Sequence, residues 1–203
     1  MPPVKQSAGI PTEGKFRNPA MLLINLVLVS IVVLFLAITY GYLAKLGTQT
    51  DDFRLPKVFW MSTLSIVSVS VLLHRLIQAY DRDNVRALRI RLGLALVAAL
   101  LFSGCQVAGW IQLDRQGLML HTDPGVAYIY VLTGLHIVHV GAGLIFLLVT
   151  VLRMRKFTAN HVGTLIYFSD PLRRDRLKML THYWHTIDFL WVFLFLAFLY
   201  NHT

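Results

Sequence analysis

Five apolar stretches, each long enough to cross a lipid bilayer, dominate this 203-residue sequence. A hydrocarbon core of roughly 30 Å needs about 20 helical residues, and suitable stretches lie at residues 21–43, 58–79, 92–113, 125–152 and 183–200. Hydrophobic residues make up 56% of the chain, which is more than a compact soluble domain of this size can bury. The sequence therefore predicts an all-α integral membrane protein in which five transmembrane helices form an antiparallel bundle.

The residues before the first apolar stretch do not resemble a signal peptide. Residues 1–20 contain four prolines and no apolar core, so we interpret them as a disordered cytoplasmic tail that stays on the protein. Residues 21–203 are then expected to form one five-helix transmembrane domain. The single cysteine, Cys105, falls inside the third stretch. A lone thiol excludes an intrachain disulfide and a metal centre built on a cysteine pair.

The formal net charge of +9 is distributed unevenly along the chain. Fifteen of the nineteen lysines and arginines lie before the first stretch, around the loop after the second, or between the fourth and fifth; four lie on the opposite side. Basic residues accumulate on the cytoplasmic side of membrane helices. We therefore predict a cytoplasmic amino terminus and a carboxyl terminus outside. Topology explains the basic charge, and nucleic-acid binding is not expected.

Ionisable side chains inside membrane helices are costly and usually face a protein interior. The fifth stretch carries His185 and Asp188 on one face, with Trp184 beside them. In the second stretch His74 lies at a depth similar to that of His185, and Arg75 can extend to the cytoplasmic surface. We expect these four ionisable side chains to form a polar cluster at the inner leaflet, because a cation and a carboxylate together are less costly than either alone. An anionic lipid headgroup would fit the same cluster.

The fourth stretch presents two different faces. Gly134 and Gly141 lie on one face, where small residues let a neighbouring helix approach closely. His136 and His139 project from the opposite face. Interhelical hydrogen bonds are the commoner role for such histidines, and metal or haem ligation is the sharper alternative. Both lie near mid-membrane, whereas His185 is only about 3–6 Å deep, so the two sets cannot hold one haem between them.

Only His74 and His185 match in depth on two different helices, so a haem held between them stays open as an alternative. One such pair among eight histidines is weak support, and we assign no catalytic residue and no metal ligand to the chain. Gln106 in the third stretch is expected to make a polar packing contact. A small proton-coupled transporter would show broken helices or internal symmetry, and neither is visible in the sequence.

Two motifs resemble the signatures of a known family. The residues YWHTIDFLW at 183–191 resemble the last-helix motif Tyr-Trp-His-x-x-Asp-x-x-Trp of subunit III of the haem-copper respiratory oxidases. The residues TGLHIVHVGAG at 133–143 are similar to that family's Thr-Gly-x-His-x-x-His-Val-x-x-Gly helix. The resemblance covers roughly residues 19–200, and the five spans match the short bacterial form of the subunit.

The resemblance implies an accessory, non-redox subunit of a proton-pumping haem-copper terminal oxidase in the bacterial plasma membrane. Such a chain binds no cofactor itself, supports the catalytic subunit I that holds haem and copper, contacts other oxidase subunits, holds structural phospholipid and sustains proton uptake in aerobic respiration. The related five-helix subunit associated with nitric oxide reductases is the alternative. The implied contacts with lipid or with another subunit are His74, Arg75, Trp184, His185 and Asp188.

Three carboxylates of the family pattern are absent from this sequence. The first apolar stretch has no acidic residue, Gly109 stands where the family has a glutamate before its tryptophan, and Lys178 replaces a glutamate shortly before the last helix. The expected lipid and proton roles therefore rest on the contact residues that remain in the second and fifth stretches.

Overall fold

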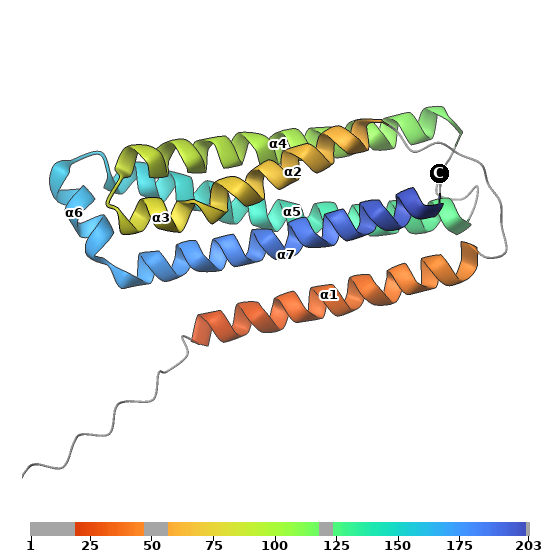
Figure 1. Cartoon of the computed structure of the whole chain (residues 1–203), viewed down its shortest axis with the longest axis horizontal. Coiled ribbons are helices and arrows are strands. Elements are labelled where there is room, and N and C mark those ends of the chain that lie inside the picture. Colours follow the sequence, from red (N-terminus) through yellow and green to blue (C-terminus); the bar gives the residue numbers. More distant parts are fainter. Residues whose placement is uncertain (1–18, 47–56, 118–123, 202–203) are drawn as a thin grey trace, which may run out of the picture.

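The computed structural model describes residues 19–46, 57–117 and 124–201. Five spans in these ranges are long and apolar enough to cross a membrane, and they lie side by side as an antiparallel bundle (Figure 1). They are α1 (Pro19–Leu46), α2 (Val58–His74) continued by α3 (Leu76–Asp81), α4 (Val85–Arg115), α5 (Pro124–Phe157) and α7 (Pro171–Asn201). The short helix α6 (His161–Ser169) connects α5 to α7. No strand occurs in the described ranges, so the all-α prediction is confirmed.

Several helices extend beyond the apolar stretches that predicted them. Helix α4 begins at Val85, because the Asn84 side chain accepts a hydrogen bond from the Ala87 amide at 2.9 Å and caps the first turn. Helix α7 begins at Pro171, a residue suited to the first helical position. The Asp170 carboxylate accepts from the Leu172 amide at 3.0 Å. Hydropathy detects the part of a helix that lies in hydrocarbon, whereas capping determines where the helix starts.

The predicted tail, residues 1–20, lies outside the described residues except for Pro19 and Ala20. These two residues form the start of α1 rather than the end of the tail.

The second span is interrupted at Arg75, between α2 and α3. The Arg75 carbonyl accepts hydrogen bonds from the guanidinium of Arg91 on α4 and from the Ala79 amide. A side chain that competes for a helix carbonyl loosens the backbone ladder at that point. The residues from Val58 to Asp81 nevertheless form a single span.

Contacts between α3 and the α6–α7 junction close one end of the bundle. The buried Tyr80 hydroxyl lies 3.1 Å from the carbonyl oxygens of Tyr167 and Asp170. Arg174 on α7 makes two hydrogen bonds of 2.8 Å to the carboxylate of Asp81. These contacts lie at the end of the bundle that the charge pattern predicts to be cytoplasmic (Figure 1).

Helix α7 is the most buried span. In its apolar window 50% of the residues are buried, against 17 to 28% in the other spans. It contacts α1, α2 and α5, while α2 and α4 make the most extensive helix pair of the bundle. Because α7 has neighbours on several sides, its polar residues point into protein rather than toward lipid.

Candidate functional site

Part of the predicted polar cluster forms where α2 meets α7. Nδ1 of His185 lies 2.5 Å from the Ser70 hydroxyl, and the ring centroids of His185 and His74 are 6.1 Å apart. His185 is half-buried, whereas His74 is exposed. The two histidines expected at equal depth therefore lie together, and Ser70, one turn before His74, orients the His185 ring. A route for protonatable groups thus leads from the surface of α2 to the interior face of α7.

Asp188 lies one turn after His185 and has no internal partner. Its side chain belongs to a residue only 4% exposed, and neither carboxylate oxygen accepts a hydrogen bond from any described residue. Arg75 was expected beside it, but Arg75 is exposed at the α2–α3 junction, and none of the ion pairs within the described ranges joins the two. The expected pairing of Asp188 with Arg75 does not form within this chain.

Trp184 and Tyr183 pack α7 against α5. Trp184 is fully buried, and a Cβ atom placed on Gly143 would lie 3.2 Å from its ring. Tyr183 donates a hydrogen bond to the carbonyl of His139 at 2.8 Å. The indole nitrogen of Trp184 has no partner in the part of the chain that the structure describes. These aromatic residues therefore contact protein, although their position in the sequence is also typical of an interfacial belt.

His136 and Trp191 form the aromatic centre of the bundle. Their ring centroids are 5.2 Å apart, and the rings of Phe35 and Phe102 lie 6.2 and 5.7 Å from His136. His136 is 1% exposed, and neither ring nitrogen has a hydrogen-bond partner among the described residues. Trp191, by contrast, donates to the Thr63 hydroxyl of α2 at 3.1 Å. His136 thus fills the core as a flat ring and does not make the expected interhelical hydrogen bond within this chain.

The other two polar residues of the interior bond locally or weakly. Nδ1 of His139 lies 2.7 Å from the carbonyl of Leu135 in its own helix, and it must be the donor because a carbonyl only accepts. Gln106 is buried and its Nε2 reaches the Ser62 hydroxyl of α2 at 3.4 Å, whereas its Oε1 has no partner within the described ranges. Gln106 therefore makes the polar packing contact between helices that the sequence predicts.

The glycines in close helix contact are not the pair expected from the sequence. A Cβ atom at Gly134 or Gly141 would meet no atom of the described chain within 4 Å, so their predicted close packing stays a prediction that another chain must fulfil. The close approaches are at Gly143 and at Gly109, where a Cβ atom would lie 2.6 Å from the Phe59 ring. Gly109 follows the buried Gln106 by three residues and so shares its helix face. That spacing was the available signal for it.

The arrangement offers polar contacts but no evident reaction. Within the described ranges no group of three histidine, cysteine or carboxylate side chains is placed to hold a metal ion. The buried groups without a protein partner on α5 and α7 are of the kind that internal water commonly satisfies. The geometry therefore fits packing and proton movement through hydrogen-bonding groups.

The sequence is similar to curated proteins from several bacteria. It is 30% identical to cytochrome c oxidase subunit 3 of Alkalihalophilus pseudofirmus over 152 residues, which are 73% of this chain and 67% of that protein. It is 28% identical to the protein of the same name from Thermostichus vulcanus, over 73% of this chain and 66% of the relative. For that of Bacillus sp. (strain PS3) the values are 25%, 80% and 76%. No family model matches the chain.

The chain spans just under two thirds of the length of the Thermostichus vulcanus protein. The bacterial relatives and the five apolar helices identify a multi-pass protein of the bacterial plasma membrane.

Proposed function

The chain belongs to the cytochrome c oxidase subunit 3 family, and on this premise we propose that it is an accessory, non-redox subunit of a proton-pumping haem-copper terminal oxidase. The observation that carries the proposal is the 30% identity to a protein of that name over 152 residues. In this role the chain supports the catalytic subunit I, which holds the haem and copper, and contributes no cofactor ligand itself.

One face of α5 supports the proposed contact with another subunit. Gly134 and Gly141 have no close neighbour within the described chain. Val138 and Ile145 lie on the same side of the helix and are each 66% exposed. A face that combines small residues with exposed apolar side chains suits close packing against a helix of a partner in the membrane. We assign this face to a neighbouring oxidase subunit.

The α2–α7 contact supports a role in proton uptake. His74 is exposed, His185 is half-buried beside Ser70, and Asp188 is buried one turn further along α7. These groups lead from the surface toward the interior, and intramembrane ionisable groups in series are typical of proton relays. A structural phospholipid would place its headgroup at the exposed end of this series, against His74 and Arg75.

Depletion of this chain from the purified complex tests the proposal. The depleted complex should keep its full haem and copper content and its optical spectrum, because no redox centre is held by this chain. Proton uptake should slow, and activity should decline earlier over many turnovers. Metal analysis, difference spectra and a long turnover assay measure these three properties. Loss of one haem in proportion to the chain would contradict the proposal and favour a haem between His74 and His185.

The identity of the partner is a separate question with a separate experiment. Mass spectrometry of the chains that co-purify with this protein from its own membrane should detect a haem-copper oxidase subunit I. Recovery with a nitric oxide reductase instead would assign the chain to the alternative complex.

A further inference from the structure

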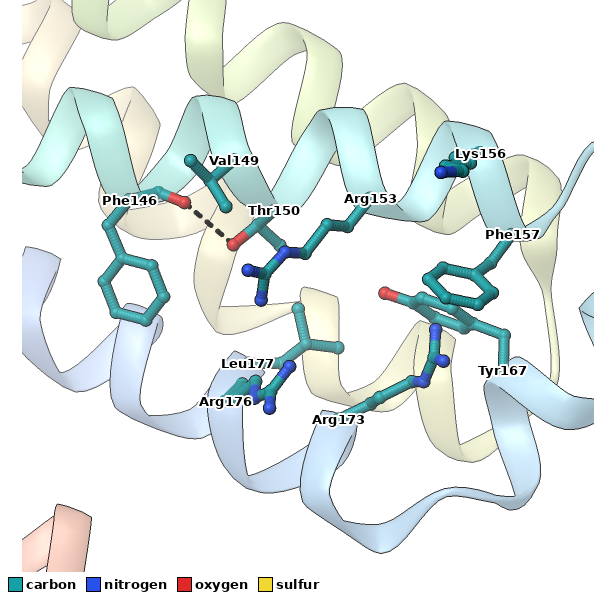
Figure 2. A pocket seen from close by; sticks show the side chains of 10 residues that line it. All are labelled: Phe146, Val149, Thr150, Arg153, Lys156, Phe157, Tyr167, Arg173, Arg176 and Leu177. Atoms are coloured by element: carbon teal, nitrogen blue, oxygen red, sulfur yellow. Dashed lines mark hydrogen bonds between the residues drawn. The ribbon is translucent and has the colours of Figure 1, made fainter.

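A cavity of about 480 Å³ opens where α5, α6 and α7 meet (Figure 2). Cations line it from two helices: Arg153 and Lys156 on α5, and Arg173 and Arg176 on α7. Its volume lies in the range of small-ligand sites. Leu177, which also lines it, precedes His185 by about 12 Å along α7. The cavity is therefore separate from the polar face discussed above.

Arg173 is held in place before any ligand arrives. Its guanidinium carbon lies 3.9 Å from the ring centroid of Phe157 and 4.7 Å from that of Tyr167. Its Nε makes an ion pair of 3.0 Å with Asp170, and its side chain is only 15% exposed. Stacking and ion pairing together fix one wall of the cavity, as Figure 2 shows for the Phe157, Tyr167 and Arg173 side chains.

The other three cations carry unneutralised charge. Arg153, Lys156 and Arg176 are exposed, and none takes part in an ion pair within residues 19–46, 57–117 and 124–201. Figure 2 shows Arg153 extending from α5 toward α7. Cations that line one cavity repel one another and concentrate anions there. The site therefore requires an anion of high charge density.

The wall below the cations is apolar. Phe146 lies two turns before Arg153 on α5, which places it about 10 Å nearer the membrane centre. Leu177 is buried on the facing side. A ligand that fits both parts has an anionic end and a hydrocarbon tail. Basic pockets between membrane helices on the cytoplasmic side suit such ligands.

We propose that this cavity binds a phosphate group, and that in the membrane the phosphate is that of an anionic phospholipid headgroup. Guanidinium groups pair with phosphate oxygens in a planar, two-bonded geometry that the rim arginines can supply. The acyl chain continues along the wall at Phe146. Free inorganic phosphate shares the anionic chemistry but leaves that wall empty. This site does not depend on the assignment of the chain to an oxidase.

Photolabelling of the full chain in phosphatidylcholine nanodiscs tests the site. The probe is phosphatidylglycerol with a photoreactive acyl chain, and peptide mapping should place the label near Phe146 or Leu177. The double variant Arg153→Gln with Arg176→Gln should bind the probe about thirtyfold more weakly, from the loss of two cations near the membrane surface. The charge-preserving variant Arg153→Lys with Arg176→Lys should restore most of the labelling.

The matched control removes two other exposed cations. Arg82→Gln with Arg86→Gln makes the same charge change on the same predicted side of the membrane, outside the cavity, and should leave labelling unchanged. Equal labelling of the Arg153→Gln, Arg176→Gln variant and this control would overturn the site. Equal labelling by a zwitterionic phosphatidylcholine probe would do the same.

Radiolabelled inorganic phosphate, added without the lipid probe, distinguishes the two sources of phosphate. We expect no saturable binding at millimolar concentration, because the rim alone holds the ligand. Saturable binding that the Arg153→Gln, Arg176→Gln variant loses would overturn the lipid assignment and give the site to soluble phosphate.

Discussion

Gly141 and Gly143 lie two residues apart on α5, yet α7 contacts only one of them. A Cβ atom on Gly143 would lie 2.9 Å from Cε1 of Tyr183 and 3.2 Å from the Trp184 ring. On Gly141 it would meet no atom of the described chain within 4 Å. The missing side chain is therefore a packing requirement of this chain at position 143. At position 141 such a requirement comes only from another molecule.

Gly143→Ala should lower the free energy of unfolding of the isolated chain by about 1–3 kcal/mol, because the added methyl group overpacks the α5–α7 contact. Gly141→Ala is the matched control and should change it by no more than about 0.5 kcal/mol. Thermal unfolding in detergent compares the two variants. Equal stabilities would mean that Tyr183 and Trp184 move aside without cost.

Asp188 gives a second prediction for a single residue. Because none of the described residues pairs with its carboxyl group, Asp188→Asn removes a buried ionisable group without leaving a partner unpaired. The stability of the isolated chain should stay unchanged or rise, as measured by thermal unfolding. In the complex, proton uptake during turnover should slow. A less stable isolated variant would reveal a partner of Asp188 inside the chain.

Among the elements, α6 depends most on contacts with its neighbours. It is nine residues long, and α3 contacts it through the Tyr80 hydroxyl bonded to its carbonyl at Tyr167. Burial raises the pKa of Tyr167 to about 12, with Tyr80 acting in the same direction and Arg173 opposing it. Ionisation of this hydroxyl would place a negative charge in a site with little access to water. The junction of α6 and α7 should therefore be sensitive to alkaline pH.

The direction of this pH dependence follows from the two pKa values of Tyr167. The folded value, about 12, exceeds the ordinary value of 10, so the folded state holds the proton more tightly. The stabilisation is complete below pH 10 and is lost as the pH rises through about 12, by up to about 2–3 kcal/mol. Tyr167→Phe should flatten the decline of the unfolding temperature across this interval. The exposed Tyr200→Phe is the control, and coincident curves would contradict the prediction.

Across the whole molecule, the basic residues and the short helix α6 mark one end of the bundle. Fifteen of nineteen lysines and arginines belong to the predicted cytoplasmic side, and the four cations of the α5–α7 cavity are among them. Reporter fusions after Asp83 and Asn160 should therefore be active in the cytoplasm. Fusions after Arg115 and Thr203 should be active outside. A cytoplasmic reporter signal at Thr203 would contradict the five-span topology.

The five spans are predictable because hydropathy over about 20 residues measures the property that a bilayer selects. The helix starts at Val85 and Pro171 are not, since they depend on caps in polar segments. Periodicity places His185 and Asp188 on one face of α7. It does not show that Ser70 bonds the first while the second lacks a partner, because both depend on how two helices rotate against each other. For His136, residue type alone does not separate a packed ring from a bonded one.

The burial of α7 has a consequence for biogenesis, because α7 is the last span to be synthesised. Helix α1 ends at Leu46, and its main contacts are with α5 and α7. At translation rates of about 5–20 residues per second, α1 waits on the order of ten seconds before Pro171 and the residues that follow it emerge. During that interval four spans are inserted without their central neighbour. Tertiary packing of the bundle therefore follows insertion as a late and concerted step, and the nascent spans need protection by lipid or by the insertion machinery until it occurs.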